Sequence, residues 1–205
     1  MKQLDKLLIG LIIGGIFPLL LGLCAVIVWF YADKDENNAL TYLLVGLAAG
    51  FLIDLRFLKK WVRHRYELPI WFVCAIYLFY NVLIYGMFMG FPVFNLFLGL
   101  MAGYYSGQRI HFNSILPEVR NRIFNRISLF TALIMTLICI SSGFIALAGN
   151  GVGKEVQSML GLDFDVTKGM IAVLAWIGGL FLIVSEYYLT KMTVKITIKL
   201  ILKSR

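Results

Sequence analysis

Five polar and aromatic residues have the types and spacing expected of a small-ligand site. Tyr77, Asn81 and Tyr85 recur every four residues, so they share one face of a helix. Asn95 begins the next apolar stretch at a similar expected depth, and Trp176 lies in the outer part of the last one. Aromatic walls with a few amide groups are typical of such sites. The alternative is an aromatic belt combined with amide hydrogen bonds between helices.

Asn81 is the strongest single candidate within this group. Its amide is expected deep in an apolar environment, where an unpaired polar group is costly. We therefore predict that Asn81 binds the ligand, if the protein has one, and that the other four residues surround it.

Three charged residues form a second candidate site. Asp54, Arg109 and Glu186 lie inside otherwise apolar stretches, and charges in such places are functional candidates because they are costly in lipid. Counted from the outer ends of their stretches, they lie about 22, 27 and 26 Å deep. This shared depth predicts a cluster near the cytoplasmic boundary, which either ties helix ends together or relays a proton or ion. The alternative is that each side chain reaches the headgroups separately.

Catalytic, metal and cofactor chemistry is not indicated. His64 and His111 lie at the edges of apolar stretches, so neither is expected to bind haem or a metal within them. Cys24, Cys74 and Cys139 lie singly in separate stretches and form no redox or zinc spacing. Because no nucleophile with a base can be identified, we expect a protein that is not an enzyme and has no cofactor.

The composition shows what surrounds these residues. Of 205 residues, 60% are hydrophobic and 15% are charged, whereas soluble domains are about 45–50% apolar and about 25% charged. The hydrophobic residues gather in long blocks, so lipid is the expected solvent. The net charge of +8 lies beside these blocks, which is typical of membrane orientation signals and argues against nucleic acid as a partner.

The apolar blocks predict an all-α bundle of six transmembrane helices in a single domain over residues 1–190. About 20 residues cross the hydrocarbon core, and the first block is interpreted as an uncleaved span. Gly90 and Pro92 separate the third span from the short fourth one, although a single long bent helix is the alternative. The expected spans are about 7–31, 39–58, 68–89, 91–107, 125–148 and 169–190.

The basic residues predict the orientation. Sixteen of the 19 Lys and Arg residues lie at the N-terminus, in the second and fourth loops, and after the last span. Positive residues remain in the cytoplasm, so both termini are expected there. Residues 191–205 form a basic tail with a lysine at every fourth position, which favours an interfacial helix on anionic lipid. Its β-branched alternation would also suit a strand.

Two glycine pairs predict close helix packing. Gly46 and Gly50 lie in GLAAGFLIDLR, and Gly99 and Gly103 lie in GLMAGYYSGQR, which has the same outline. Small residues four apart let helix backbones approach closely. The similarity predicts two related hairpins that superpose with Gly50 on Gly103, although chance can produce it because apolar helices use few residue types.

Together these features indicate a small integral membrane protein. We expect a transporter, or a substrate-binding membrane subunit, for a small solute. The alternative is a non-catalytic accessory or scaffold protein that binds anionic lipid, a membrane-protein partner or a second copy of itself. No eukaryotic targeting signature is evident, so a prokaryotic cytoplasmic membrane is the expected location.

Overall fold

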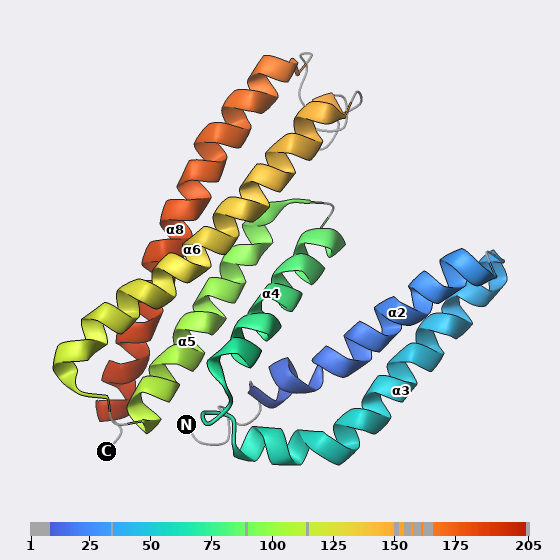
Figure 1. Ribbon diagram of the computed structural model, residues 1–205. Coiled ribbons are helices and arrows are strands. Elements are labelled where there is room, and N and C mark those ends of the chain that lie inside the picture. The colour runs from blue at the N-terminus through green and yellow to red at the C-terminus, as the bar shows by residue number, and fades with distance from the viewer. Residues whose placement is uncertain are drawn as a thin grey trace. The chain divides into compact units, whose positions relative to one another are not determined.

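The protein is all-helical throughout the residues that its computed structural model describes. These residues are 89% helical and contain no strand, which confirms the predicted all-α class. The helices are α2 (Ile16–Ala32), α3 (Glu36–Arg63), α4 (Ile70–Met87), the short η1 (Pro92–Asn95), α5 (Leu96–Phe112), α6 (Pro117–Ala148) and α8 (Lys168–Lys203) (Figure 1). The described residues are 9–33, 35–88, 90–113, 115–149, 152–153, 157, 161 and 166–203.

Five helices in the described part of the chain are long and apolar enough to cross a membrane: Ile9–Ala32, Asn37–Arg63, Ile70–Met87, Glu118–Ala148 and Lys168–Lys203. The predicted count of six is not confirmed, because the expected fourth span is only the 17-residue α5. At about 1.5 Å per residue, α5 covers about 26 Å of a core about 30 Å thick. The expected break before α5 is present, since Gly90 adopts a φ of 81° and Pro92 starts η1.

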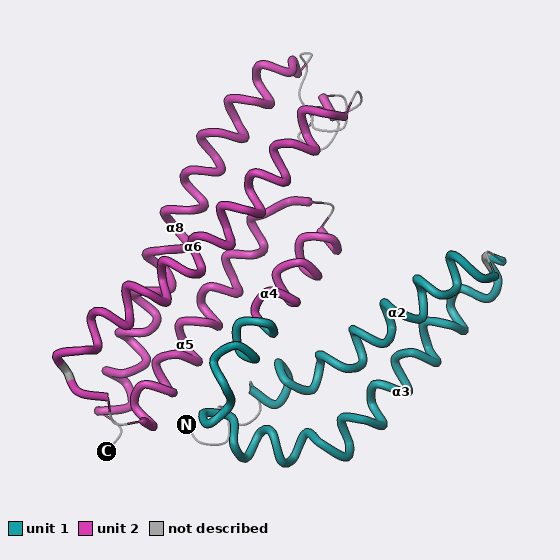
Figure 2. Tube along the Cα trace, viewed as in Figure 1, with its two compact units in different colours: residues 1–76 teal, residues 77–205 magenta. Residues whose placement is uncertain are grey.

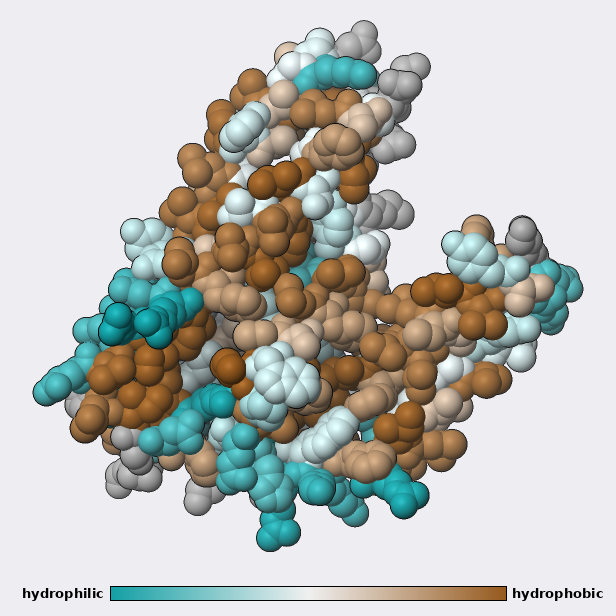
Figure 3. Space-filling view, viewed as in Figure 1, coloured by the Kyte–Doolittle hydropathy of each residue, from teal (hydrophilic) through white to brown (hydrophobic). Residues whose placement is uncertain are grey.

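Apolar side chains cover much of the helix surfaces, as the brown atoms in Figure 3 illustrate. Leu55 is 75% exposed, Phe144 is 73% exposed and Trp176 is 80% exposed. A soluble monomer rarely exposes large contiguous apolar areas. These surfaces indicate an integral membrane protein whose helices face lipid.

The chain divides into two compact units, Met1–Ile76 and Tyr77–Arg205 (Figure 2). In the first unit, α2 and α3 pack against each other in opposite directions. A Cβ atom at Gly46 would lie 2.9 Å from Cα of Gly22, and one at Gly50 would overlap the backbone of Pro18. Both glycines therefore lie where the two backbones approach most closely.

In the second unit, α5 and α8 run in the same direction. Gly99 faces Glu186, Gly103 faces Thr190, and Gly107 faces Thr197, so the numbers rise together along both helices. The α6 helix runs the opposite way along α8, with Thr131 beside Thr190 and Cys139 beside Gly179. The α5 and α6 helices therefore both pack against α8.

The glycine pairs of the two units have different partners. Gly46 and Gly50 pack on the helix that precedes theirs, whereas Gly99 and Gly103 pack on α8, which follows much later in the chain. The structure therefore gives no support to the predicted hairpin repeat. The shared letters reflect the same requirement for close packing, met by unrelated neighbours.

The C-terminal residues 191–203 continue α8 without a break, so they are helical and not a strand. Val194 and Ile198 are buried in a cluster with Ile110 of α5 and Phe124 of α6. One face of the expected tail is therefore packed inside the second unit. Its lysines occupy the other face, and Lys195 and Lys199 are exposed.

Candidate functional site

A chain of hydrogen-bonded polar side chains runs through the interior of the second unit. The Tyr77 hydroxyl donates to Oε1 of Glu186 over 2.9 Å, and Nδ2 of Asn81 donates to the Tyr77 carbonyl over 2.9 Å. Nδ2 of Asn95 donates to Oδ1 and to the carbonyl of Asn81, over 3.0 and 2.9 Å. We call these four residues the polar chain.

Glu186 is the acidic member of the polar chain, and its side chain is 1% exposed. It lies at the middle of the 36-residue α8, about 27 Å along the helix from Lys168. Its Oε1 accepts the Tyr77 hydrogen bond, whereas its Oε2 is buried with no hydrogen-bond partner among the described residues. One carboxylate oxygen is therefore available to a proton, a cation or a ligand donor.

Gly99 makes the space that this carboxyl group occupies. A Cβ atom at Gly99 would overlap both carboxylate oxygens and Cδ of Glu186. Any larger residue at this position would push the carboxyl group out of the α5–α8 interface. The α5 helix thus positions Glu186 through the absence of a side chain.

Hydroxyl groups extend this polar region one turn further along α8. Thr190 donates to the carbonyl of Gly99 over 3.3 Å, and its Oγ1 lies 3.1 Å from Oγ1 of Thr131 on α6. The Ser128 hydroxyl is also buried and has no partner among the described residues. None of these hydroxyl residues was among the predicted site residues, although the three-residue spacing of Ser128 and Thr131 in ISLFTAL places those two on one helix face.

The five predicted ligand residues occupy different places. Tyr77, Asn81 and Asn95 belong to the polar chain. The Tyr85 hydroxyl lies against the turn at Gly90, and Trp176 is 80% exposed on α8. The amides of Asn81 on α4 and Asn95 at the end of η1 bond to each other, as the inter-helix alternative requires. Their role in binding a solute stays a prediction.

Of the three charged residues in the second predicted site, Arg109 and Glu186 lie in the second unit, at different levels. Because Gly99 lies opposite Glu186 and the two helices run parallel, Arg109 lies ten residues, or about 15 Å, further along than Glu186. The equal depth expected for these two residues is therefore not observed. The expected depths assumed that α5 and α8 begin at the same outer surface, whereas α8 begins well before the level of the first turn of α5. Asp54 belongs to the other unit, where both carboxylate oxygens are buried beside Gly14.

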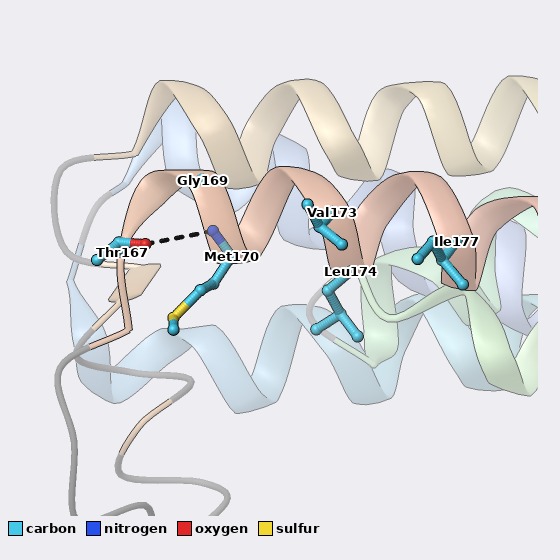
Figure 4. Close-up of a pocket in the computed structure, with 6 residues that line it drawn as sticks. All are labelled: Thr167, Gly169, Met170, Val173, Leu174 and Ile177. Atoms are coloured by element: carbon cyan, nitrogen blue, oxygen red, sulfur yellow. Dashed lines mark hydrogen bonds between the residues drawn. The ribbon is translucent and has the colours of Figure 1, made fainter.

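Two surface grooves lie away from the polar chain. The first follows one side of α8 near its start, where Met170 N–H donates to Oγ1 of Thr167 over 3.3 Å (Figure 4). Apart from Thr167 and Gly169 its lining is apolar: Met170, Val173, Leu174 and Ile177. The second groove, of about 360 Å³, lies between the start of α6 and the end of α8 and includes three basic residues.

Comparison of this chain with protein-family models, with curated proteins and with solved structures found no match.

Proposed function

We propose that this protein carries a small solute across a membrane and that Glu186 is the proton- or cation-binding group of the transport path. The observation that carries this proposal is the Glu186 carboxyl group, which is fully buried at the middle of α8 with one oxygen unpartnered. Buried ionisable groups are rare in membrane helices, and where they occur they usually mark ion or substrate paths.

The chemistry of a buried carboxyl group supports this role. An isolated carboxylate is very costly in an apolar interior, so the group is stable only when it holds a proton or has a cation beside it. The Tyr77 hydroxyl supplies one hydrogen bond to Oε1, which fixes the orientation of the carboxyl group. Oε2 is then the oxygen that takes and releases the transported proton or cation.

The polar chain also suggests how a solute would couple to this group. The bond between Asn81 and Asn95 joins α4 to the residue that precedes α5, and Tyr77 joins α4 to Glu186. A solute that exchanges the Asn81–Asn95 bonds for its own would release α4 from α5. Since Tyr77 lies one turn before Asn81 on α4, its bond to Glu186 would respond to the same event.

The membrane arrangement that we propose has six crossings with both termini in the cytoplasm, and α5 serves as the short fourth crossing. The parallel course of α5 and α8 supports this arrangement, because both would then run from the outside to the inside. The loop charges favour the same orientation in a prokaryotic cytoplasmic membrane.

Ion flux in vesicles tests the proposal. The full-length protein would be reconstituted into liposomes, and proton and Na⁺ entry would be followed under an imposed membrane potential. We expect entry above that of protein-free liposomes, abolished by Glu186→Gln and unaffected by Glu118→Gln, an exposed glutamate in the first turn of α6. Unchanged flux in Glu186→Gln would overturn the role of Glu186, and flux equal to empty liposomes for both ions would overturn the proposal.

A second candidate function is a non-catalytic scaffold that binds a membrane partner or a second copy of itself. The observation that favours it is that every described hydrogen bond between polar-chain side chains joins two helices. In that case Glu186 only holds the bundle together. Glu186→Gln would then lower the melting temperature of a protein that conducts neither ion, and crosslinking in membranes would capture a stoichiometric partner.

A further inference from the structure

We infer that the groove between the start of α6 and the end of α8 binds one anionic phospholipid, with the phosphate at its basic residues and an acyl chain along its apolar floor. This inference is independent of transport. The groove is lined by the basic residues Arg120, Lys195 and Lys199, by Asn121, and by the apolar residues Phe124, Ile198 and Leu202, which we call its floor.

The floor of the groove is apolar and anchored in the core. Phe124 is 6% exposed and Ile198 is 7% exposed, and both belong to the buried cluster with Ile110 and Val194. Leu202 is 55% exposed at the same groove. An apolar surface of this kind suits an acyl chain better than a soluble anion.

The basic residues are arranged to receive a phosphate. Nε of Arg120 donates to the carbonyl of Ile115 over 2.9 Å, which fixes the guanidinium group and leaves its terminal nitrogens as donors. Lys195 and Lys199 lie one turn apart on α8, and both are exposed. Cations placed together in this way attract anionic headgroups, at about 1 kcal/mol each.

Acidic residues do not neutralise this charge from the helices around the groove. Glu118 is the only acid of α6, and it lies two positions before Arg120, on another side of the helix. Glu186 is the only acid of α8 and lies about 14 Å before Lys195 along the helix. The α5 helix carries no acid, and its last turn contributes Arg109 and His111.

The groove also lies at the right height for a headgroup. Gly107 of α5 packs against Thr197, so Lys195 and Lys199 are level with the last turns of α5. Basic residues at Arg109 and beyond mark the expected cytoplasmic boundary of the membrane there. A lipid in this groove would keep its phosphate at that boundary while its acyl chain stays on the apolar floor.

Native mass spectrometry of the full-length protein tests this inference. The protein would be transferred from mixed micelles that contain phosphatidylglycerol and phosphatidylcholine in equal amounts. We expect one retained phosphatidylglycerol. The double variant Lys195→Gln/Lys199→Gln should weaken its binding by about 30-fold, the equivalent of about 2 kcal/mol.

A matched double variant controls for general loss of charge. Arg122→Gln/Arg126→Gln removes two exposed cations from α6 that do not line the groove, so we expect phosphatidylglycerol retention to stay as in the unmodified protein. Equal losses in the two double variants would overturn the inference, and so would equal retention of the two lipids. Thermal unfolding of both variants verifies that they are folded.

A third experiment distinguishes a bound lipid from a bound free anion. Leu202→Gln alters the floor at an exposed position, and it should weaken lipid retention without loss of folding. Inorganic phosphate should fail to displace the lipid, because it makes no contact with the floor. If phosphate displaces the lipid and Leu202→Gln leaves lipid retention unchanged, the groove is a simple anion site and the inference is overturned.

Discussion

The hydroxyl of Tyr77 donates a 2.9 Å hydrogen bond to Oε1 of Glu186, a residue 109 positions later in the chain. Replacing Tyr77 with Phe removes this donor and leaves both carboxylate oxygens without a partner. We expect a loss of about 1–3 kcal/mol in the free energy of unfolding, measured by denaturant titration in detergent. Tyr31→Phe, at a tyrosine that is 77% exposed, should be neutral.

A double-mutant cycle sharpens this test. Tyr77→Phe and Glu186→Gln act on one hydrogen bond, so their effects on the free energy of unfolding should be non-additive. Strictly additive effects would show that the two side chains do not interact in the folded protein.

Gly99→Ala should destabilise the protein because its methyl group would overlap the Glu186 carboxyl group. Overpacking of this kind costs about 1–3 kcal/mol. The matched control is Gly178→Ala in α8, where a Cβ atom would meet nothing within 4 Å. We expect that control to be neutral or stabilising by up to about 1 kcal/mol, since alanine favours helices over glycine.

Glu186→Ala should partly relieve the effect of Gly99→Ala, because it removes the group that the new methyl would meet. The melting temperatures of the two single variants and the double variant measure this relief. If the fall in melting temperature of the double variant equals the sum of the falls in the two single variants, Gly99 does not act through Glu186.

Asn95→Ala should weaken the connection between α4 and the start of α5, which Asn95 immediately precedes, since it removes two hydrogen bonds to Asn81. Hydrogen bonds between membrane helices are worth about 0.6–2 kcal/mol, so we expect a measurable fall in melting temperature. Asn125→Ala is the control, because Asn125 is exposed and accepts one long bond of 3.5 Å from Tyr187. Equal effects at the two positions would contradict a linking role for Asn95.

Val194→Ala tests whether the end of α8 is part of the folded core. Val194 is 0% exposed, so the truncation leaves a cavity and should cost on the order of 1–3 kcal/mol. Ile196→Ala, at a residue that is 51% exposed two positions later, should have little effect. Similar melting temperatures for both variants would show that residues 191–203 do not pack on α5 and α6.

Local patterns explain which features could be predicted from the sequence. The four-residue spacing placed Tyr77 and Asn81 on one face, and Gly90 with Pro92 indicated the turn before Asn95. These features depend only on helix geometry and on the backbone preferences of glycine and proline. The helix over residues 191–203 could be predicted in the same way, from the lysine at every fourth position.

The pairing of Glu186 with Tyr77 and Gly99 could not be predicted, because it depends on how far each helix is shifted along its neighbour. The expected depths counted every span from a membrane surface, but α8 begins well before the level of the first turn of α5, whereas the two helices end at similar levels. A shift of a few residues between parallel helices changes which side chains meet. That shift is set by the glycine faces of α5, whose partner on α8 leaves no local sign in the sequence.

The α8 helix contains a glycine pair before Glu186 and neither glycine nor proline after it, so its two halves differ in stiffness. From Glu186 to Lys203 the helix contains neither glycine nor proline, so this half behaves as a rigid rod of about 26 Å. Just before it, Gly178 and Gly179 form the kind of pair at which helices bend, with Cys139 of α6 against Gly179. We therefore expect any displacement of the lysine-bearing end of α8 to move the Glu186 carboxyl group with it, with the helix bending at the glycine pair.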